Sequence, residues 1–309
     1  MNAHFTRLAE SYKEWLSIIG YTKSSVANLP RRIKELFAYM ENLPADRHGQ
    51  NINQLTEITK EHINLYYESL KTKKSEQTGE LLKNSTLNGI IRNLKLFNHY
   101  LEETNQGFLP IDLHYEPKQE AEREIFSQEE IKALYNATDD SILGLRDRAI
   151  LSVYYGCGLR SNEGTSLDLD DILLEKRLVY VRKGKQYKER YVPFVESQQK
   201  DFRIYLNECR NQLVKNENSL PADKQEKAFL VNNQGSRIGY STISKTLKRL
   251  LERAGIEKTT GMHTLRHSIA THLLQSGMNI EDIATFLGHK QISSTQVYTH
   301  IAAEGEHNL

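Results

Sequence analysis

The sequence predicts a mainly α-helical protein with two domains: a four-helix N-terminal domain and a mixed helical C-terminal domain with a small antiparallel sheet. Apolar residues recur at helical spacing through most of the 309 residues. A charged stretch with a proline and no apolar period interrupts them near residue 113, as linkers do. One segment alternates on both sides of a glycine-bearing turn, which indicates a β-hairpin. We therefore expect domains over 1–112 and 125–309, joined by a linker at 113–124.

The first domain is expected to consist of helices only. Apolar residues of its first helix share one face at a period of 3.6 residues, namely Leu8, Tyr12, Trp15, Leu16 and Ile19. Thr59 is expected to cap the third helix, and Asn84 or Ser85 the fourth. The four expected helices lie over 7–19, 24–43, 58–73 and 84–103.

The second domain is expected to be helical around the hairpin. A capping box at Ser127 and Glu130 opens its first helix. A second helix starts at residue 141 and is expected to end at Gly156 and Gly158. The hairpin covers residues 177–194. Further helices are expected over 197–214, 241–255, 263–277, 279–289 and 294–301.

Composition excludes some classes of protein and gives a mixed signal for nucleic-acid binding. No run of about 18 apolar residues occurs, which argues against a membrane protein, and the N-terminus lacks an apolar signal-peptide core. Cys157 and Cys209 fit no metal-ligand spacing, so the reducing cytoplasm is the expected location. The net charge is only +1, although residues 180–191 and 245–253 are strongly basic. Taken alone, each basic segment is best explained as a solvated surface.

Four short polar stretches, however, carry residues that helix packing alone would not select. If these stretches converge, they bring together two arginines, a lysine, two histidines and a tyrosine. Arginine pairs bidentately with phosphate oxygens, histidine moves protons near neutral pH, and a tyrosine hydroxyl is a feasible nucleophile. This set suits a phosphodiester. The stretches are 156–167, 181–190, 263–267 and 287–300.

At these stretches the sequence resembles the tyrosine recombinases, also called phage integrases, and among them the shorter Xer-type members. GLRSNE provides an arginine with a glutamate three residues on, Arg160 and Glu163. HTLR provides the family's His-x-x-Arg box with His263 and Arg266. The residue after Glu163 is Gly164, where the family usually has an apolar residue.

The remaining boxes follow in the family's order. A Leu-Gly-His box ends at His289, and Tyr298 comes nine residues later in TQVYTH. A lysine on the hairpin turn completes the set, with Lys183 favoured and Lys185 as its competitor. Each box is weak by itself, whereas all of them at family-like spacing are specific. The resemblance extends over the whole chain.

The resemblance implies that Arg160 and Arg266 clamp the scissile phosphate and that Glu163 orients Arg160. It implies that Tyr298 attacks the phosphate and forms a 3′-phosphotyrosine. Loss of one arginine contact is expected to raise the barrier by roughly 3–4 kcal/mol, by analogy with oxyanion-hole deletions.

The same resemblance assigns the proton transfers. Lys183 would protonate the departing 5′ oxygen, His263 would accept or position the tyrosine proton, and His289 would hydrogen-bond the phosphate. Neither a metal nor a nucleotide cofactor is expected, because the phosphotyrosine retains the energy of the broken bond.

The resemblance also implies partners. The first domain would be a core-binding DNA-binding domain and the second the catalytic domain. The expected partner is double-stranded DNA with a specific recombination site, bound by a homo-tetramer that passes through a Holliday junction. A second recombinase or an accessory protein is a further possible partner, and no membrane is involved. The expected outcome of the reaction is resolution, inversion, integration or transposition of DNA. Family members often dock a C-terminal helix onto a neighbouring protomer, but only 11 residues follow Tyr298.

Sequence recognition is expected on two helices that would face the DNA major groove. Exposed polar faces of other helices look the same in sequence. The residues expected to contact DNA are Asn88, Arg92 and Lys95 on one helix and Ser241, Lys245 and Lys248 on the other.

Simpler explanations exist for each residue taken singly. Arg160 could cap the preceding helix, His289 could interact with a helix dipole, and most tyrosines only pack. The His263 and His267 pair invites a zinc reading, but no third ligand has clear spacing. For the whole chain, the alternatives are a type IB topoisomerase-like DNA-relaxing enzyme and a DNA-binding protein that has lost catalysis. Every expected catalytic position is filled, which favours the recombinase.

Overall fold

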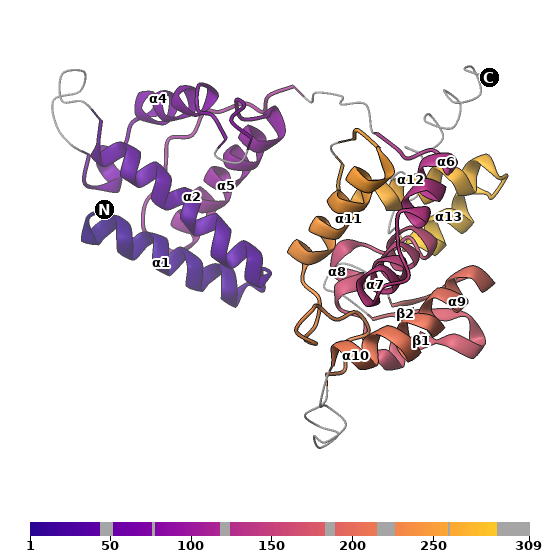
Figure 1. Cartoon of the computed structure of the whole chain (residues 1–309). Helices are drawn as coiled ribbons and strands as arrows, with labels where there is room; N and C mark the ends of the chain where they lie inside the picture. The colour runs from indigo at the N-terminus through magenta and orange to yellow at the C-terminus, as the bar shows by residue number, and fades with distance from the viewer. Residues whose placement is uncertain are drawn as a thin grey trace. The chain divides into compact units, whose positions relative to one another are not determined.

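The computed structural model describes residues 1–43, 52–75, 78–117, 124–182, 189–214, 226–258 and 260–288. The chain forms two compact units, Met1–Glu122 and Arg123–Leu309, each with its own hydrophobic core (Figure 1). The expected mainly α fold with a small antiparallel sheet is confirmed. Among the described residues, no helix is both long enough and apolar enough to cross a membrane.

The first unit is built from helices whose aromatic side chains interlock. Phe5 and Phe37 stack with ring centroids 4.1 Å apart, and Tyr12 meets Phe97 edge-on at 5.0 Å. The buried Tyr12 hydroxyl donates to Asn93 at 3.0 Å, so this polar group is satisfied inside the core. Its described helices are α1 (Ala3–Ile18), α2 (Lys23–Glu41), the single 3₁₀ turn η1 (Leu55–Glu57), α4 (Lys60–Lys71) and α5 (Asn84–Glu103).

The start of one helix and the cap of another differ from expectation in this unit. α1 begins four residues earlier than predicted, because the Asn2 side chain accepts from the Phe5 amide and caps the helix. The prediction that Asn84 or Ser85 caps α5 was wrong. Lys83 occupies the N-cap position, and its side chain makes no capping hydrogen bond. The side-chain amide of Asn84 donates instead to the Pro117 carbonyl at 3.0 Å. The Thr59 cap of α4 is confirmed.

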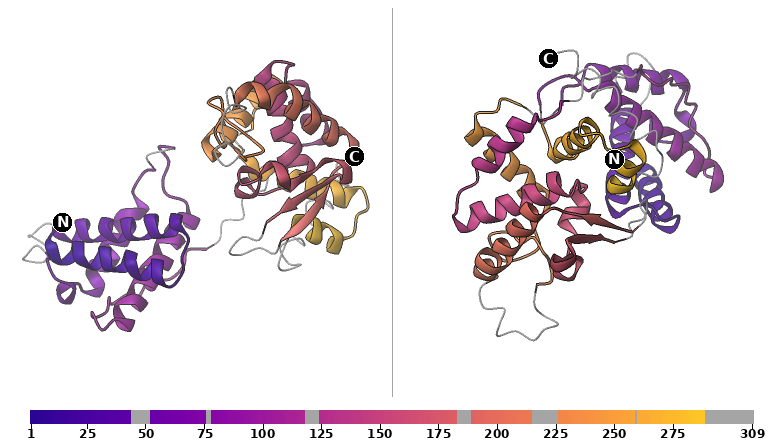
Figure 2. Two further views of the ribbon diagram at one scale, coloured as in Figure 1. Left: turned by 90° about the horizontal axis from the view of Figure 1, so that it is seen from below. Right: turned by 90° about the vertical axis from the view of Figure 1, so that its right-hand side faces the viewer.

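The second unit places helices around a small sheet (Figure 2). The capping box of Ser127 and Glu130 opens its first helix, as expected. Two helices end in π-helical turns, over Ser152–Gly156 and Tyr205–Arg210. The α-helices are α6 (Gln128–Asn136), α7 (Ile142–Leu151), α8 (Ser161–Thr165), α9 (Glu196–Ile204), α10 (Asn211–Leu213), α11 (Tyr240–Ala254), α12 (Met262–Gln275) and α13 (Ile280–Leu287).

The sheet has three antiparallel strands in the order β1 (Ile172–Leu173), β2 (Leu178–Val181) and β3 (Arg190–Pro193). β2 and β3 form the expected hairpin, with Val179 opposite Val192 on the buried face. Strand β1 was not expected, since two residues are too short to show a period of two.

Candidate active site

The first arginine box lies on a sharp turn between α7 and α8. Gly158 has φ +59°, a left-handed conformation that suits glycine. Arg160 then occupies the N-cap position of α8. Its amide donates to Glu163 Oε2 and its Nη1 to Glu163 Oε1, both at 2.9 Å. The side chain is therefore held against the next turn of its own helix.

The second arginine box lies on the first turns of α12. Arg266 is only 3% exposed. Its Nη1 donates to the Gly158 carbonyl at 2.6 Å and its Nη2 to the Leu287 carbonyl at 2.7 Å. His263 lies one turn earlier on the same helix, where solvent reaches part of its side chain. Backbone carbonyls from two distant segments thus fix the orientation of a buried guanidinium.

The C-terminal end of α13 supplies acceptors to both arginines. Gly288 ends the helix with φ +66°, and the last carbonyls of a helix have no partner within it. Arg160 donates to the Leu287 and Gly288 carbonyls, each at 3.3 Å. Arg266 shares the Leu287 carbonyl, so the two guanidinium groups converge on one oxygen. The negative end of the helix dipole favours these cations.

Arg190, on β3, is a third arginine of this cluster that the sequence reasoning missed. Its Nη1 and Nη2 donate to the two oxygens of Glu163, each at 3.0 Å. Its Nε donates to the Phe286 carbonyl at 3.1 Å. A signal was present in the sequence, because strand alternation places Arg190 on the same face as the buried Val192. A charged residue on the inward face of a strand needs a buried partner.

The protonation of two groups follows from this arrangement. Burial raises the pKa of Glu163, but hydrogen bonds and positive charge from Arg190 and Arg160 outweigh it and lower the pKa to about 2. Partial burial, together with the charges of Arg266 and Arg160, lowers the pKa of His263. Near neutral pH the cluster therefore holds three guanidinium charges, one carboxylate and a neutral histidine. The surplus of positive charge suits a phosphodiester.

Several predicted residues lie outside the described residues. Lys183, its competitor Lys185, His289 and Tyr298 belong to this group. Within the described part, Arg160, Glu163, His263 and Arg266 are brought together. The rings of His263 and His267 lie 6.4 Å apart. No group of three or more His, Cys, Asp or Glu residues in that part could hold a metal ion.

The structure also shows how Gly164 fits beside Glu163. A Cβ atom at this position would lie 2.6 Å from ring atoms of Tyr154, which therefore fill the space. The Tyr154 hydroxyl donates to the Ser161 carbonyl at 3.1 Å. A large aromatic residue from the π-helical turn thus compensates for the missing side chain and supports α8.

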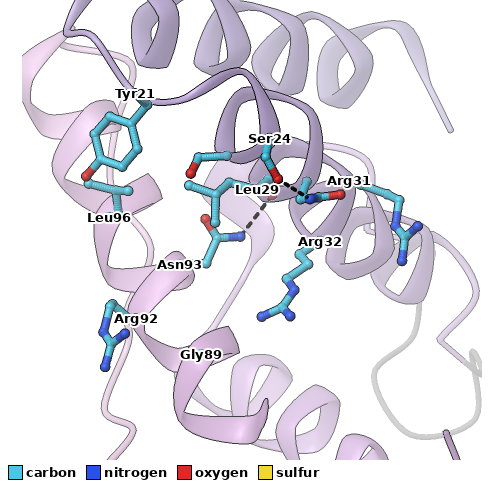
Figure 3. Close-up of a pocket in the computed structure, with 11 residues that line it drawn as sticks. Tyr21, Ser24, Leu29, Arg31, Arg32, Gly89, Arg92, Asn93 and Leu96 are labelled. Carbon is cyan, nitrogen blue, oxygen red and sulfur yellow. Dashed lines mark hydrogen bonds between the residues drawn. The ribbon is translucent and has the colours of Figure 1, made fainter. Parts of the chain in front are cut away.

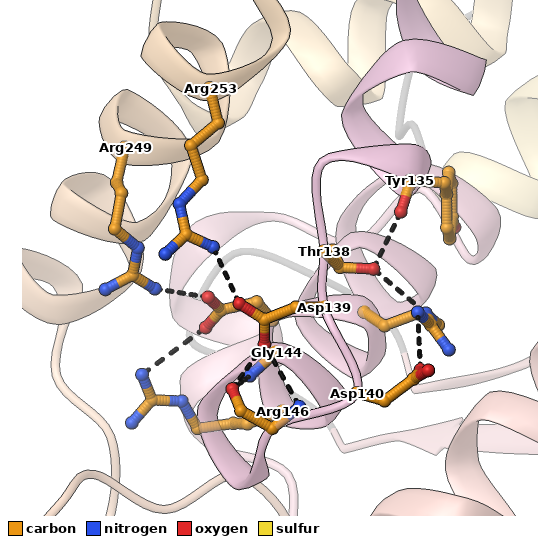
Figure 4. A network of polar contacts seen from close by, with 11 residues as sticks. Tyr135, Thr138, Asp139, Asp140, Gly144, Arg146, Arg249 and Arg253 are labelled. Atoms are coloured by element: carbon orange, nitrogen blue, oxygen red, sulfur yellow. Dashed lines mark hydrogen bonds and ion pairs between the residues drawn. The ribbon is translucent and has the colours of Figure 1, made fainter.

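Helix α11 exposes the three residues expected to contact DNA in this unit, Ser241, Lys245 and Lys248. Its opposite face is buried and includes Ile243, Leu247 and Leu250. Two arginines anchor α11 to the start of the second unit (Figure 4). Arg249 pairs with the buried Asp147 of α7, and Arg253 pairs with Asp139 at 3.0 Å.

In the first unit, the three residues expected to contact DNA have different surroundings. Asn88 donates to and accepts from the backbone of Glu116, at 2.9 and 2.7 Å. Lys95 lies over the Tyr115 ring, 4.8 Å from its centroid. Arg92 is exposed beside a cavity of about 520 Å³ between α2 and α5 (Figure 3).

The sequence reasoning missed the contribution of α2 to this cavity. Its lining includes polar residues at helical spacing on α2, namely Ser24, Ser25, Asn28, Arg31 and Arg32. Their recurrence over two turns, opposite the buried Ile33 and Phe37, was visible in the sequence.

Comparison with known proteins decides which family this chemistry belongs to. The profile of the phage integrase family matches residues 124–304, more than half of the chain. The chain belongs to the phage integrase family. Relatives of the Xer type agree, so it is a Xer-type tyrosine recombinase, in a family of enzymes that cleave and transfer DNA strands. The expected family is confirmed.

Two relatives illustrate the extent of the similarity. Tyrosine recombinase XerC 2 of Ralstonia nicotianae is 30% identical over 304 residues, covering 97% of this chain and 83% of that one. Tyrosine recombinase XerD of Oceanobacillus iheyensis is 36% identical over 219 residues, covering 70% and 71%.

Solved structures share the fold of this phage integrase family member. XerH recombinase bound to palindromic difH substrate in a post-cleavage complex has a TM-score of 0.69 at 18% identity, covering 99% of this chain and 84% of that one. The Tn1549 transposon integrase in complex with transposon right end DNA has a TM-score of 0.67 at 17% identity, covering 97% and 98%.

Proposed function

We propose that this protein is a site-specific recombinase that cuts DNA through a 3′-phosphotyrosine at Tyr298, with Arg160 and Arg266 holding the scissile phosphate. One observation carries the proposal. Both guanidinium groups donate to the Leu287 carbonyl, at 3.3 and 2.7 Å, so they can also reach a single small acceptor. Two converging arginines complement the extra negative charge of a pentacoordinate phosphorus.

The strand cleavage is a balanced exchange of one phosphoester for another. The Tyr298 oxygen forms a bond to phosphorus as the bond from phosphorus to the 5′ oxygen breaks. His263, neutral near pH 7 because its pKa is lowered, accepts or positions the tyrosine proton. Lys183, or Lys185 in its place, donates a proton to the departing 5′ oxygen, and His289 hydrogen-bonds the phosphate.

Rejoining reverses these steps on a different strand. A 5′ hydroxyl from the partner duplex attacks the phosphotyrosine and releases Tyr298, and two such exchanges pass through a Holliday junction. The chemistry requires no cofactor, since each step replaces one phosphoester with another. Glu163 accepts hydrogen bonds from the guanidinium and the amide of Arg160. It acts by orienting Arg160 and does not contact the reacting atoms.

Both units are proposed to bind one recombination site. In the catalytic domain, 125–309, the exposed face of α11 presents Ser241, Lys245 and Lys248, while the buried Asp147 holds the helix in place through Arg249. In the core-binding domain, 1–112, the α2–α5 cavity offers arginines and small polar groups to phosphates and base edges. Residues 113–124 link the two.

The assembly follows from the reaction. Two duplexes exchange four strands, so a homo-tetramer on DNA is proposed. Two free, buried cysteines suit action in the reducing cytoplasm. A second recombinase or an accessory protein could supply some of the protomers or control the order of cleavage.

The test is covalent capture on DNA. A pool of nicked suicide duplexes with randomised arms is incubated with the protein, and adducts that resist denaturing detergent are isolated and sequenced. We expect adducts on one inverted-repeat sequence and a phosphotyrosine at Tyr298 by mass spectrometry.

Two variants make this test decisive. Tyr298→Phe should form no adduct, and Tyr191→Phe, which changes an exposed tyrosine of β3, should form adducts at the wild-type rate. Adducts from Tyr298→Phe would contradict the assignment of the nucleophile. Adducts on every sequence, with relaxation of plasmids that lack any particular site, would point instead to a topoisomerase.

A further inference from the structure

Arg190 joins three segments that carry the proposed catalytic residues. It starts strand β3, binds both oxygens of Glu163 at 3.0 Å, and donates through Nε to the Phe286 carbonyl at 3.1 Å. Its side chain is only 9% exposed, so solvent does not compete for these bonds. The hairpin, the first arginine box and the end of α13 therefore meet at one side chain.

We propose that Arg190 is a positioning residue for DNA cleavage, which fixes Glu163 and thereby sets the placement and net charge of the Arg160 and Arg266 pair. The proposal rests on the function proposed above. Arg190 is not assigned a contact with the phosphate, because its guanidinium is directed at Glu163 and the Phe286 carbonyl.

The charge balance of the cluster supports this role. Glu163 accepts two hydrogen bonds on each oxygen, one of each pair from Arg190 and the other from Arg160. Arg266 Nη1 lies 3.8 Å from the same carboxylate. With Arg190 present, the three arginines and one carboxylate sum to +2. Without it, the carboxylate would cancel half of the charge that Arg160 and Arg266 offer to a phosphate.

The backbone around Arg190 supports a positioning role as well. Arg190 pairs across the hairpin with Val181, two residues before Lys183. At the other end of its side chain it lies against Gly288, the residue before His289. A Cβ atom on Gly288 would come within 2.8 Å of Arg190 Nη1, so a larger residue there would displace the arginine side chain. One side chain thus fixes backbone next to two further proposed catalytic residues.

The cleavage experiment uses Arg190→Met and Arg190→Lys on a nicked suicide duplex at saturating protein. We expect Arg190→Met to slow covalent capture by up to about 10²-fold, since misplaced catalytic groups cost this much. DNA affinity should stay within about twofold, because the DNA-contacting faces are elsewhere. Arg190→Lys keeps the charge and should recover part of the rate.

A matched control separates positioning from general support of the fold. Arg237 resembles Arg190: it pairs with a carboxylate, Asp168, and donates to the carbonyls of Thr165 and Leu167. Arg237→Met should keep the wild-type capture rate. The double variant of Arg190→Met with Glu163→Gln should slow capture by less than the product of the two single effects, because Arg190 acts largely through Glu163.

A second readout does not depend on catalysis. Glutamate labelled with ¹³C at the carboxyl carbon, with the Glu163 signal assigned by its loss in Glu163→Gln, is titrated by NMR in wild type and in Arg190→Met. We expect the Glu163 midpoint to rise in Arg190→Met and to stay unchanged in Arg237→Met.

The outcomes distinguish the two proposals. If wild type forms no adduct, the proposed function fails and this inference falls with it. If wild type forms adducts and Arg190→Met captures DNA at the same rate, or the Glu163 midpoint does not move, only the positioning role is overturned. A slowing in Arg190→Met that adds fully to that of Glu163→Gln would also overturn it.

Discussion

Two carboxylates of the second unit, the largely buried Glu163 and the buried Asp147, each face arginines, yet their pKa values shift in opposite directions. At Glu163, burial raises the pKa, but hydrogen bonds and charge from Arg190 and Arg160 outweigh burial and lower the pKa to about 2. At Asp147, burial prevails over the charges of Arg146 and Arg249, and the pKa is raised. Proximity to arginine therefore does not decide the protonation of a buried carboxylate.

The number of hydrogen bonds accounts for the difference. Glu163 accepts two on each oxygen. Among the described contacts, each Asp147 oxygen accepts one hydrogen bond. One comes from Arg146 at 3.3 Å and the other from Arg249. A carboxylate with all its acceptor positions filled stays charged and can hold several cations together. The Glu163 cluster thus concentrates charge for a substrate, whereas the Asp147 cluster ties α11 to α7.

The largest effects should come from removing one arginine of each cluster. Arg266→Ala should slow covalent capture of DNA by about 10²–10³-fold, because an arginine that stabilises transition-state charge is lost. Arg146→Ala should lower the free energy of unfolding by about 3–5 kcal/mol, because the buried Asp147 carboxylate loses one of its two positively charged partners. Capture kinetics and urea unfolding measure the two effects, with Arg203→Ala, on an exposed pair, as control. If Arg266→Ala and Arg146→Ala lost the same stability and captured DNA at the same rate, the two clusters would not differ in role.

The pH dependence of stability should have opposite signs at the two carboxylates. The folded pKa of Glu163 lies below its ordinary value of 4.5, so its contribution is present above about pH 4.5 and is lost as the pH falls toward 2. This contribution is on the order of 3 kcal/mol. Asp147 has a raised pKa, so its contribution is present below its ordinary value of 3.8 and is lost as the pH rises.

Urea unfolding of wild type, Glu163→Gln and Asp147→Asn between pH 3 and pH 7 tests these signs. On acidification, the stability advantage of wild type over Glu163→Gln should shrink, and that over Asp147→Asn should grow. Parallel curves for the two variants would show that the carboxylates do not differ.

The apolar support beneath Glu163 should show a smaller effect. Gly164→Ala places a methyl group against the Tyr154 ring and should cost about 1–3 kcal/mol by overpacking. Combining Gly164→Leu with Tyr154→Ala should cost less than the sum of the single changes, since each compensates for the volume of the other. Additive losses in urea unfolding would mean that these residues do not share the space.

Two glycines in the same conformation separate backbone strain from contact with the cluster. Gly255 and Gly288 both end helices with φ near +67°, but a Cβ atom meets Arg190 only at Gly288. Gly255→Ala should cost about 1 kcal/mol of stability, and Gly288→Ala about 1 kcal/mol more. Only Gly288→Ala should slow DNA capture. If the two variants lost the same stability and captured DNA at the same rate, displacing the Arg190 side chain would have no effect on the site.

The smallest effects should come from single lysines on the helix that the Asp147 cluster holds. Lys245→Ala and Lys248→Ala should each reduce the slope of log affinity against log salt by about 1, because each removes one phosphate contact. Fluorescence anisotropy on the captured site measures the slope. An unchanged slope in both variants would place the DNA on another face.

Local signals predicted much of the fold. The capping boxes at Thr59 and Ser127 mark helix starts because their hydrogen bonds are local. The start of α5 was predicted correctly, but its cap was not, because the Asn84 side chain instead bonds Pro117, which is distant in sequence. Strand β1 was missed because its pairing with β2 and not its own composition defines it.

The candidate site shows the same division. Residues in short boxes, such as Arg160 and Arg266, could be named from spacing, and the structure brings them together. Strand alternation indicated that Arg190 faces inward, but its partners Glu163 and Phe286 come from distant segments and could not be named. The polar face of α2 was likewise visible, but not its place in the α2–α5 cavity, since Arg31 and Arg92 line that cavity together only after folding.

The grip of the two arginines on the phosphate would be seen in a crystal structure of the protein on its captured site, with vanadate in place of the scissile phosphate. We expect nitrogens of both Arg160 and Arg266 at about 2.7–2.9 Å from vanadate oxygens and the Tyr298 oxygen bonded to vanadium. Vanadate held elsewhere, with both arginines still directed at the Leu287 carbonyl, would contradict it.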